Sequence, residues 1–73
     1  MIKRNTKKVL DGKLSELTMN LENNYKDLAH DALKDLQGTL EQMKGSGELK
    51  EKDYLRYKQK ADDYAQRMVG YHH

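Results

Sequence analysis

The sequence predicts a small all-α protein, an antiparallel helical hairpin in which a long helix is followed by a glycine turn and a shorter helix. Three observations lead to this prediction. Apolar residues recur every three or four positions through most of the chain, proline is absent, and a Gly-Ser-Gly run at 45–47 interrupts the pattern. The alternation typical of strands does not fit these segments. The 73 residues are enough for one domain.

The first helix is predicted over residues 6–44. Its apolar stripe advances by about 3.7 residues per step, which is close to the period of a straight α-helix. The stripe consists of Leu10, Leu14, Leu17, Leu21, Tyr25, Leu28, Ala32, Leu36, Leu40 and Met43, flanked by Met19, Ala29 and Leu33. Lys44 suits the negative end of the helix dipole, and the glycines that follow tolerate the left-handed backbone of a helix end.

Asn23 and Asn24 mark the place where this helix could break. Both are mediocre helix formers, and a break there would produce a three-helix bundle. However, no glycine or proline stands beside them, and the apolar register continues through them. The continuous helix is therefore the preferred interpretation, and the three-helix bundle with a break at 23–24 is the alternative.

The second helix is predicted over residues 50–69. With Lys50 as N-cap, Leu49 and Tyr54 occupy the two positions of a hydrophobic staple, and Asp53 occupies the acidic position of a capping box. Apolar residues follow the three-four spacing of a heptad seam. This seam consists of Tyr54, Tyr57, Ala61, Tyr64, Met68 and Tyr71.

The two predicted helices differ in length. At about 1.5 Å per residue the first is roughly 58 Å long and the second roughly 30 Å, so the second covers only the C-terminal part of the first. The expected hairpin core is Tyr25, Leu28, Ala32, Leu36, Leu40, Met43, Tyr54, Tyr57, Ala61, Tyr64 and Met68. The leucines left uncovered are Leu10, Leu14, Leu17 and Leu21. We expect them to form an oligomer or partner interface, in a homodimer of four-helix or coiled-coil-like form, with a helix of another protein as the rival occupant.

The composition excludes several classes of protein. Cysteine is absent, and no apolar run reaches the roughly 18 residues of a membrane-spanning helix. The basic N-terminus is followed by no apolar segment of the kind found in secretory signals. We therefore expect a cytoplasmic protein without membrane contact, in which residues 1–5 form a flexible basic arm and residues 70–73 a frayed tail.

The polar residues show no spacing typical of a catalytic or metal site. Asp27, Asp31 and Asp35 share a helical stripe that is best explained as a solvated face. His30 is expected at the surface, and the two histidines at 72–73 are expected in the frayed tail. No metal, no cofactor and no enzymatic activity are expected.

The sequence therefore favours a non-enzymatic protein that acts through protein–protein interaction, as an adaptor, co-chaperone or small regulator. The alternative is a nucleic-acid-binding regulator whose N-terminal cations contact phosphates. Those cations are Lys3, Arg4, Lys7 and Lys8. Without these four, ten basic residues remain against twelve acidic ones, so the rest of the chain does not favour nucleic acid.

Overall fold

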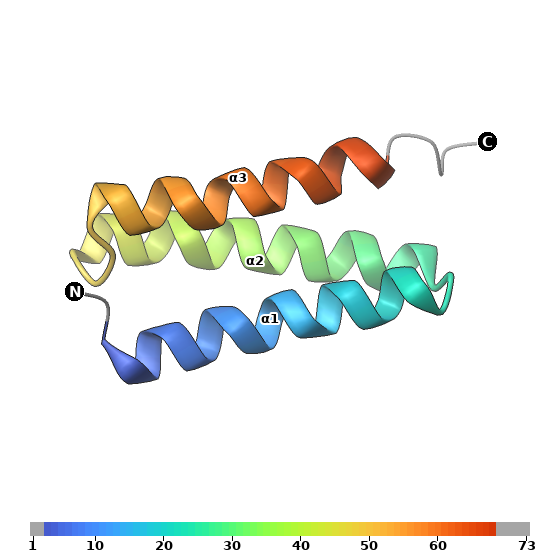
Figure 1. The fold of residues 1–73 in the computed structure, drawn as a ribbon, viewed down its shortest axis with the longest axis horizontal. Coiled ribbons are helices and arrows are strands. Elements are labelled where there is room, and N and C mark those ends of the chain that lie inside the picture. The colour runs from blue at the N-terminus through green and yellow to red at the C-terminus, as the bar shows by residue number, and fades with distance from the viewer. Residues whose placement is uncertain (1–2, 69–73) are drawn as a thin grey trace.

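The computed structural model describes residues 3–68, and within that range it contains three α-helices and no strand. Helix α1 spans Arg4–Glu22, α2 spans Lys26–Ser46 and α3 spans Glu51–Met68. Neighbours in the chain run antiparallel, with α2 between α1 and α3 (Figure 1). The all-α prediction is confirmed, and the arrangement is the three-helix alternative.

The continuous first helix is wrong, because the chain turns at residues 23–25. Asn24 has a φ of +60°, in the left-handed region that asparagine adopts more readily than most residues other than glycine. Its N–H donates to the carbonyl of Leu21 at 3.1 Å, and the N–H of Tyr25 donates to the carbonyl of Asn20 at 2.9 Å. This pair of bonds is the Schellman ending of a helix. The turn therefore needs neither glycine nor proline.

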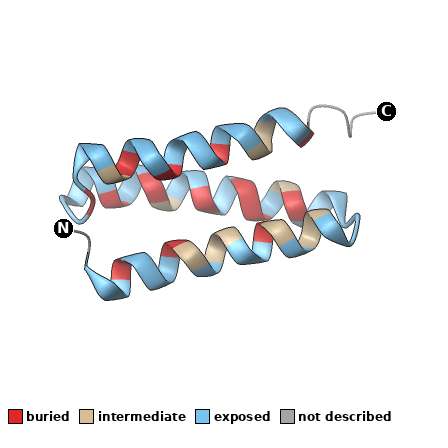
Figure 2. Ribbon diagram, viewed as in Figure 1, coloured by how far each residue is buried: buried red, intermediate tan, exposed pale blue. Residues whose placement is uncertain are grey.

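The α1 leucines that the hairpin would have left uncovered belong to the core of the bundle. Leu10 and Leu17 are fully buried, and Leu14 and Leu21 are partly buried against them. Figure 2 shows buried and intermediate positions along the side of α1 that faces α2. The rest of the core consists of Ala29, Ala32, Leu33, Leu36, Leu40 and Met43 from α2, Leu49 from the turn between α2 and α3, and Tyr54, Tyr57, Ala61 and Met68 from α3. Because one chain covers this stripe by itself, the reason for expecting a dimer through it no longer holds.

Two residues expected in the core lie at the surface instead. Tyr25 is 54% exposed and Leu28 is 53% exposed. Once α2 starts at Lys26, its buried face centres on Ala29 and Leu33, which the sequence pattern had placed at the flank of the stripe. Leu28 precedes Ala29 by one position, a rotation of about 100° around the helix, and so lies at the edge of that face.

The second turn and the start of α3 follow the sequence prediction. Gly47 has a φ of +85° and closes α2, with its N–H donating to the carbonyl of Lys44 at 3.2 Å. Lys50 lies just before α3, and its carbonyl accepts the N–H of Tyr54 at 2.9 Å. Both members of the predicted staple, Leu49 and Tyr54, are buried.

The two ends of the chain differ in part from what the sequence predicts. Helix α1 begins at Arg4, so residues 4–5 of the predicted basic arm are helical. The first two residues of that arm, the end of the predicted second helix at 69 and the predicted tail at 70–73 lie outside the described residues. No helix among residues 3–68 combines the length and the apolar content that spanning a membrane requires.

Truncation of a core leucine in α1 tests the bundle. Leu17→Ala should lower the free energy of unfolding by about 2–5 kcal/mol, because it leaves a cavity at a fully buried position. Met19→Ala, two residues away and 58% exposed, should change it by less than about 0.5 kcal/mol. Urea unfolding followed by circular dichroism measures both. Similar small effects of the two substitutions would contradict the packing of α1 in the core.

Candidate functional site

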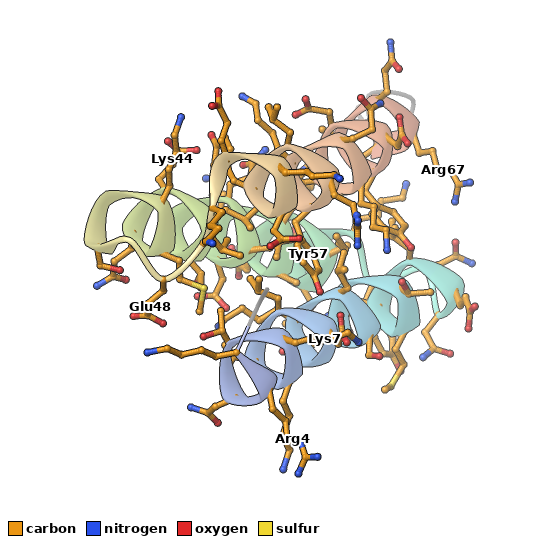
Figure 3. All side chains as sticks on the ribbon, turned by 60° about the vertical axis from the view of Figure 1, so that its left-hand side comes forward. Arg4, Lys7, Lys44, Glu48, Tyr57 and Arg67 are labelled. Atoms are coloured by element: carbon orange, nitrogen blue, oxygen red, sulfur yellow. The ribbon has the colours of Figure 1, made fainter. Side chains whose placement is uncertain are left out.

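Tyrosine hydroxyls link α3 to α1. The hydroxyl of Tyr57 donates to Oδ1 of Asp11 at 3.0 Å, and Figure 3 shows the Tyr57 side chain between the two helices. The hydroxyl of Tyr64 and Oγ1 of Thr18 lie within hydrogen-bonding distance, at 2.8 Å. The α1 and α3 backbones approach each other less closely than either approaches α2. The two tyrosines therefore bridge a wider gap, with the ring against the core and the hydroxyl at its polar edge.

A third tyrosine links α3 to α2. The hydroxyl of Tyr54 donates to the carboxylate of Glu41, which raises the pKa of the phenol above its usual value, as does burial of the ring. The Nζ of Lys44 lies 4.4 Å from the centroid of the Tyr54 ring, a distance at which a cation and an aromatic face attract each other. The tyrosine seam predicted as core thus also supplies the polar links of α3.

The Tyr57–Asp11 bond shifts the pKa of both groups. Burial, followed by the hydrogen bond to Asp11, raises the pKa of Tyr57 to about 12. The pKa of Asp11 is lowered, mainly by its 2.8 Å bond to Nζ of Lys7 and further by the Tyr57 hydroxyl, although partial burial opposes both. Asp11 therefore stays ionised and Tyr57 stays neutral near neutral pH, which keeps both bonds intact.

A groove opens between α1 and α3 beside the Thr18–Tyr64 bond, with a volume of about 670 Å³. We call it the α1–α3 groove. It is lined by Leu14, Ser15, Thr18, Met19 and Glu22 from α1 and by Lys60, Asp63, Tyr64 and Arg67 from α3. Leu14 and Tyr64 are partly buried, whereas Met19 is 58% exposed. Apolar groups thus lie between charged residues of both signs.

A smaller recess lies on the other side of α3. It has a volume of about 170 Å³ and is lined by Gln37, Leu40, Glu41, Lys58, Ala61 and Asp62. Binding sites for small molecules and anchoring side chains usually occupy roughly 300–1,000 Å³, so the α1–α3 groove has a suitable size and this recess does not. The α1–α3 groove is therefore the candidate site.

The residues predicted as a partner interface have different positions in the bundle. Leu10 and Leu17 are enclosed by the chain itself, and Leu21 is partly buried against the core. Leu14 lines the α1–α3 groove together with Met19, a residue that the sequence pattern placed beside the leucine stripe. The spacing of apolar residues within α1 was enough to predict this wall of the groove. The opposite wall comes from α3, and its position could be known only from the packing of the three helices.

The predicted nucleic-acid contacts lie at the other end of α1. Lys3 precedes the helix, and Arg4, Lys7 and Lys8 are exposed within its first two turns. Lys7 forms an ion pair with Asp11, so the charge it offers to a phosphate is reduced. No acidic residue stands in the first turn, where helices favour negative charge.

Metal ligands do not gather within the described part of the chain. Residues 3–68 contain no group of three or more histidine, cysteine, aspartate or glutamate side chains that could hold a metal ion. His30, which was expected at the surface, is partly exposed. Asp35, from the predicted acidic stripe, forms an ion pair with Lys13 of α1 at 2.5 Å.

The raised pKa of Tyr57 predicts how stability depends on pH. Between 10.0, the ordinary value, and about 12, the folded chain keeps the Tyr57 proton while the unfolded chain loses it. The free energy of unfolding should therefore fall with rising pH across this window, and fall less steeply in Tyr57→Phe, which keeps the ring but has no proton to lose. Urea unfolding at several pH values measures the difference. Parallel curves for the two proteins would rule out the shift.

Comparison of the chain with models of known protein families, with curated proteins and with solved structures gives no match. Within residues 3–68, the α1–α3 groove combines partly buried apolar side chains with charged borders, which suits it to bind another molecule.

Proposed function

We propose that this chain is a non-enzymatic protein-interaction module, an adaptor, co-chaperone or small regulator, whose α1–α3 groove receives a helix of a partner protein. The observation that supports this proposal is the open groove of about 670 Å³ between two helices, with exposed Met19 at its edge. An amphipathic helix that places apolar side chains between two helices is a common mode of recognition. Methionine suits such a site because its flexible thioether adapts to different partner side chains.

The borders of the groove indicate which helix would fit. Lys60 and Arg67 are seven residues apart, so they lie on the same face of α3, about 10 Å apart along its axis. Asp63 lies between them and accepts a hydrogen bond from Gln59 at 3.2 Å. Acidic residues at a matching seven-residue spacing in the partner would pair with the two cations.

The opposite border selects for the other charge. Glu22 stands at the end of α1, where a basic residue of the partner would pair with it. The proposed partner segment therefore has an apolar face with acidic residues on the side toward α3 and a basic residue on the side toward α1. Such complementarity mainly sets orientation and specificity, while the contacts with Leu14, Met19 and the Tyr64 ring supply affinity.

Photo-crosslinking in cells tests the proposal. A photoreactive amino acid at exposed Ser15, in the groove, should capture a discrete protein, and mass spectrometry should map the captured peptide to an amphipathic helical segment. Met19→Glu should abolish the adduct, because a carboxylate would replace the apolar contact. Leu55→Glu is the matched control, since Leu55 is 53% exposed and absent from the groove lining. An adduct that survives Met19→Glu, or is lost equally in both variants, would refute the groove as the binding site.

Titration of the purified chain with labelled DNA and RNA separates this proposal from the nucleic-acid alternative. We expect no salt-sensitive binding, that is, no complex whose affinity falls steeply between about 50 and 200 mM salt. Salt-sensitive binding that is lost when Lys3, Arg4 and Lys8 are replaced by alanine, together with no protein adduct at Ser15, would support the alternative instead.

A further inference from the structure

We propose that two copies of this chain also form a domain-swapped dimer. In this dimer the turn at 23–25 straightens, α1 and α2 join into one helix, and each α1 packs on the α2 and α3 of the other copy. Three features of the chain support the proposal: the apolar register across the turn, the symmetry of the α1–α2 contact, and the chemistry of the turn itself. The proposal does not depend on what the α1–α3 groove binds.

The apolar register continues through the turn without an insertion. Leu21, Tyr25, Leu28 and Ala32 are separated by four, three and four residues, so in one continuous helix they would lie along the same side. In the single-chain bundle, however, Tyr25 and Leu28 are each more than half exposed. A continuous helix would place both in line with Leu21, with Tyr25 beside the junction of the two copies. Exposed Tyr25 thus fits an interface that the single chain lacks, whereas Leu28 keeps the same neighbours in both forms.

The contact between α1 and α2 is symmetric about the turn. Nζ of Lys13 and Oδ2 of Asp35 are 2.5 Å apart, and Asn24 lies midway between these two residues in the sequence. Two continuous helices that pair antiparallel in the same register therefore cross with their two-fold axis near Asn24. The Lys13–Asp35 pair then re-forms twice, each time between the two copies. The Tyr25 residues of the two copies come together at the axis, because each is one residue away from it.

The turn is also a short connection whose hydrogen bonds have helical replacements. It consists of three residues with no glycine or proline, and its left-handed residue is Asn24. The bonds of Asn24 to Leu21 and of Tyr25 to Asn20 would be replaced by ordinary helical hydrogen bonds. Short connections between elements that can exchange identical contacts are the usual route to swapping.

The links between α1 and α3 would be preserved in the exchange. The Tyr57–Asp11 and Tyr64–Thr18 hydrogen bonds join α3 to α1, so in the dimer each would form between copies. Each α1–α3 groove would then be composite. One copy would supply its α1 wall with Met19, and the other would supply its α3 wall, so the dimer would carry two grooves, each completed by the second copy.

Substitutions in the turn test the proposal. Asn23→Ala combined with Asn24→Ala raises helix propensity and disfavours the left-handed turn, so the dimer fraction should increase several-fold. Asn24→Gly relieves the positive φ and should decrease it. Asn5→Ala, the same change in exposed Asn5 far from the turn, is the matched control and should leave it unchanged. Light scattering after size-exclusion chromatography, over a concentration series of refolded protein, measures the fraction. A double-alanine variant that is monomeric throughout would overturn the proposal.

Isotope-coded crosslinking distinguishes a swapped dimer from one in which intact bundles associate. Light and heavy-nitrogen chains are unfolded, mixed and refolded, and the separated dimer is treated with a carbodiimide that joins adjacent amines and carboxylates. Crosslinked Lys13–Asp35 peptides should contain mixed light–heavy pairs in the dimer and only same-isotope pairs in the monomer. The Lys7–Asp11 pair, within one helix at 2.8 Å, is the internal control and should give same-isotope pairs in both. Same-isotope Lys13–Asp35 pairs alone in the dimer would refute the exchange.

Discussion

The two hydrogen bonds that close the turn at 23–25 determine the arrangement of the whole bundle. They hold Asn24 at a φ of +60°, which reverses the chain and places α1 alongside α2. A left-handed residue other than glycine costs about 1–2 kcal/mol, and asparagine lies at the favourable end of that range. In return Leu10 and Leu17 become fully buried, and burial of one leucine side chain is worth roughly 1.5–3 kcal/mol. The burial term exceeds the strain of the turn, so in a chain this short the break is preferred over an extended helix with uncovered leucines.

Helix α3 is joined to the other two helices by tyrosines, and the chain contains no phenylalanine or tryptophan. A phenylalanine would bury as much ring surface but would leave the polar groups at the edge of the core without these partners. The Tyr57 hydroxyl meets Asp11 and the Tyr64 hydroxyl meets Thr18, so the two bonds set the register of α3 along α1. Ser15 and Thr18 on α1 are small, and the space above them is not filled by longer side chains. The same widely spaced contact that needs tyrosines as bridges therefore also produces the α1–α3 groove.

Much of this fold follows from local sequence chemistry, but the break at 23–25 does not. The helix content, the end of α2 at Gly47 and the start of α3 after Lys50 depend on glycine geometry and helix-start patterns that are legible in the sequence. The break depends on a left-handed Asn24 that is stabilised by burial of leucines many residues away, and a local pattern carries no such information. The predicted mismatch in helix length followed from a continuous first helix, which is wrong; the leucines that it left uncovered are covered because α1 folds back on α2. One wall of the groove was visible as the spacing of Leu14 and Met19, whereas Lys60 and Arg67 join the site only through the packing of α3.

The uninterrupted apolar register explains why this sequence is compatible with two ways of covering the same leucines. Within one chain, α1 and α2 are held together by a three-residue connection, which acts as a very high effective concentration and favours the closed bundle in dilute solution. In the proposed exchange the same contacts would form between two chains, Asn24 would become helical, and Tyr25 would gain a covered position. The balance then depends on chain concentration and on the residues at 23 and 24, not on the strength of the core, because the core is nearly the same in both forms. Since α1 is both the exchanged helix and one wall of the groove, a partner helix that contacts α1 and α3 together would bind either form through the same residues.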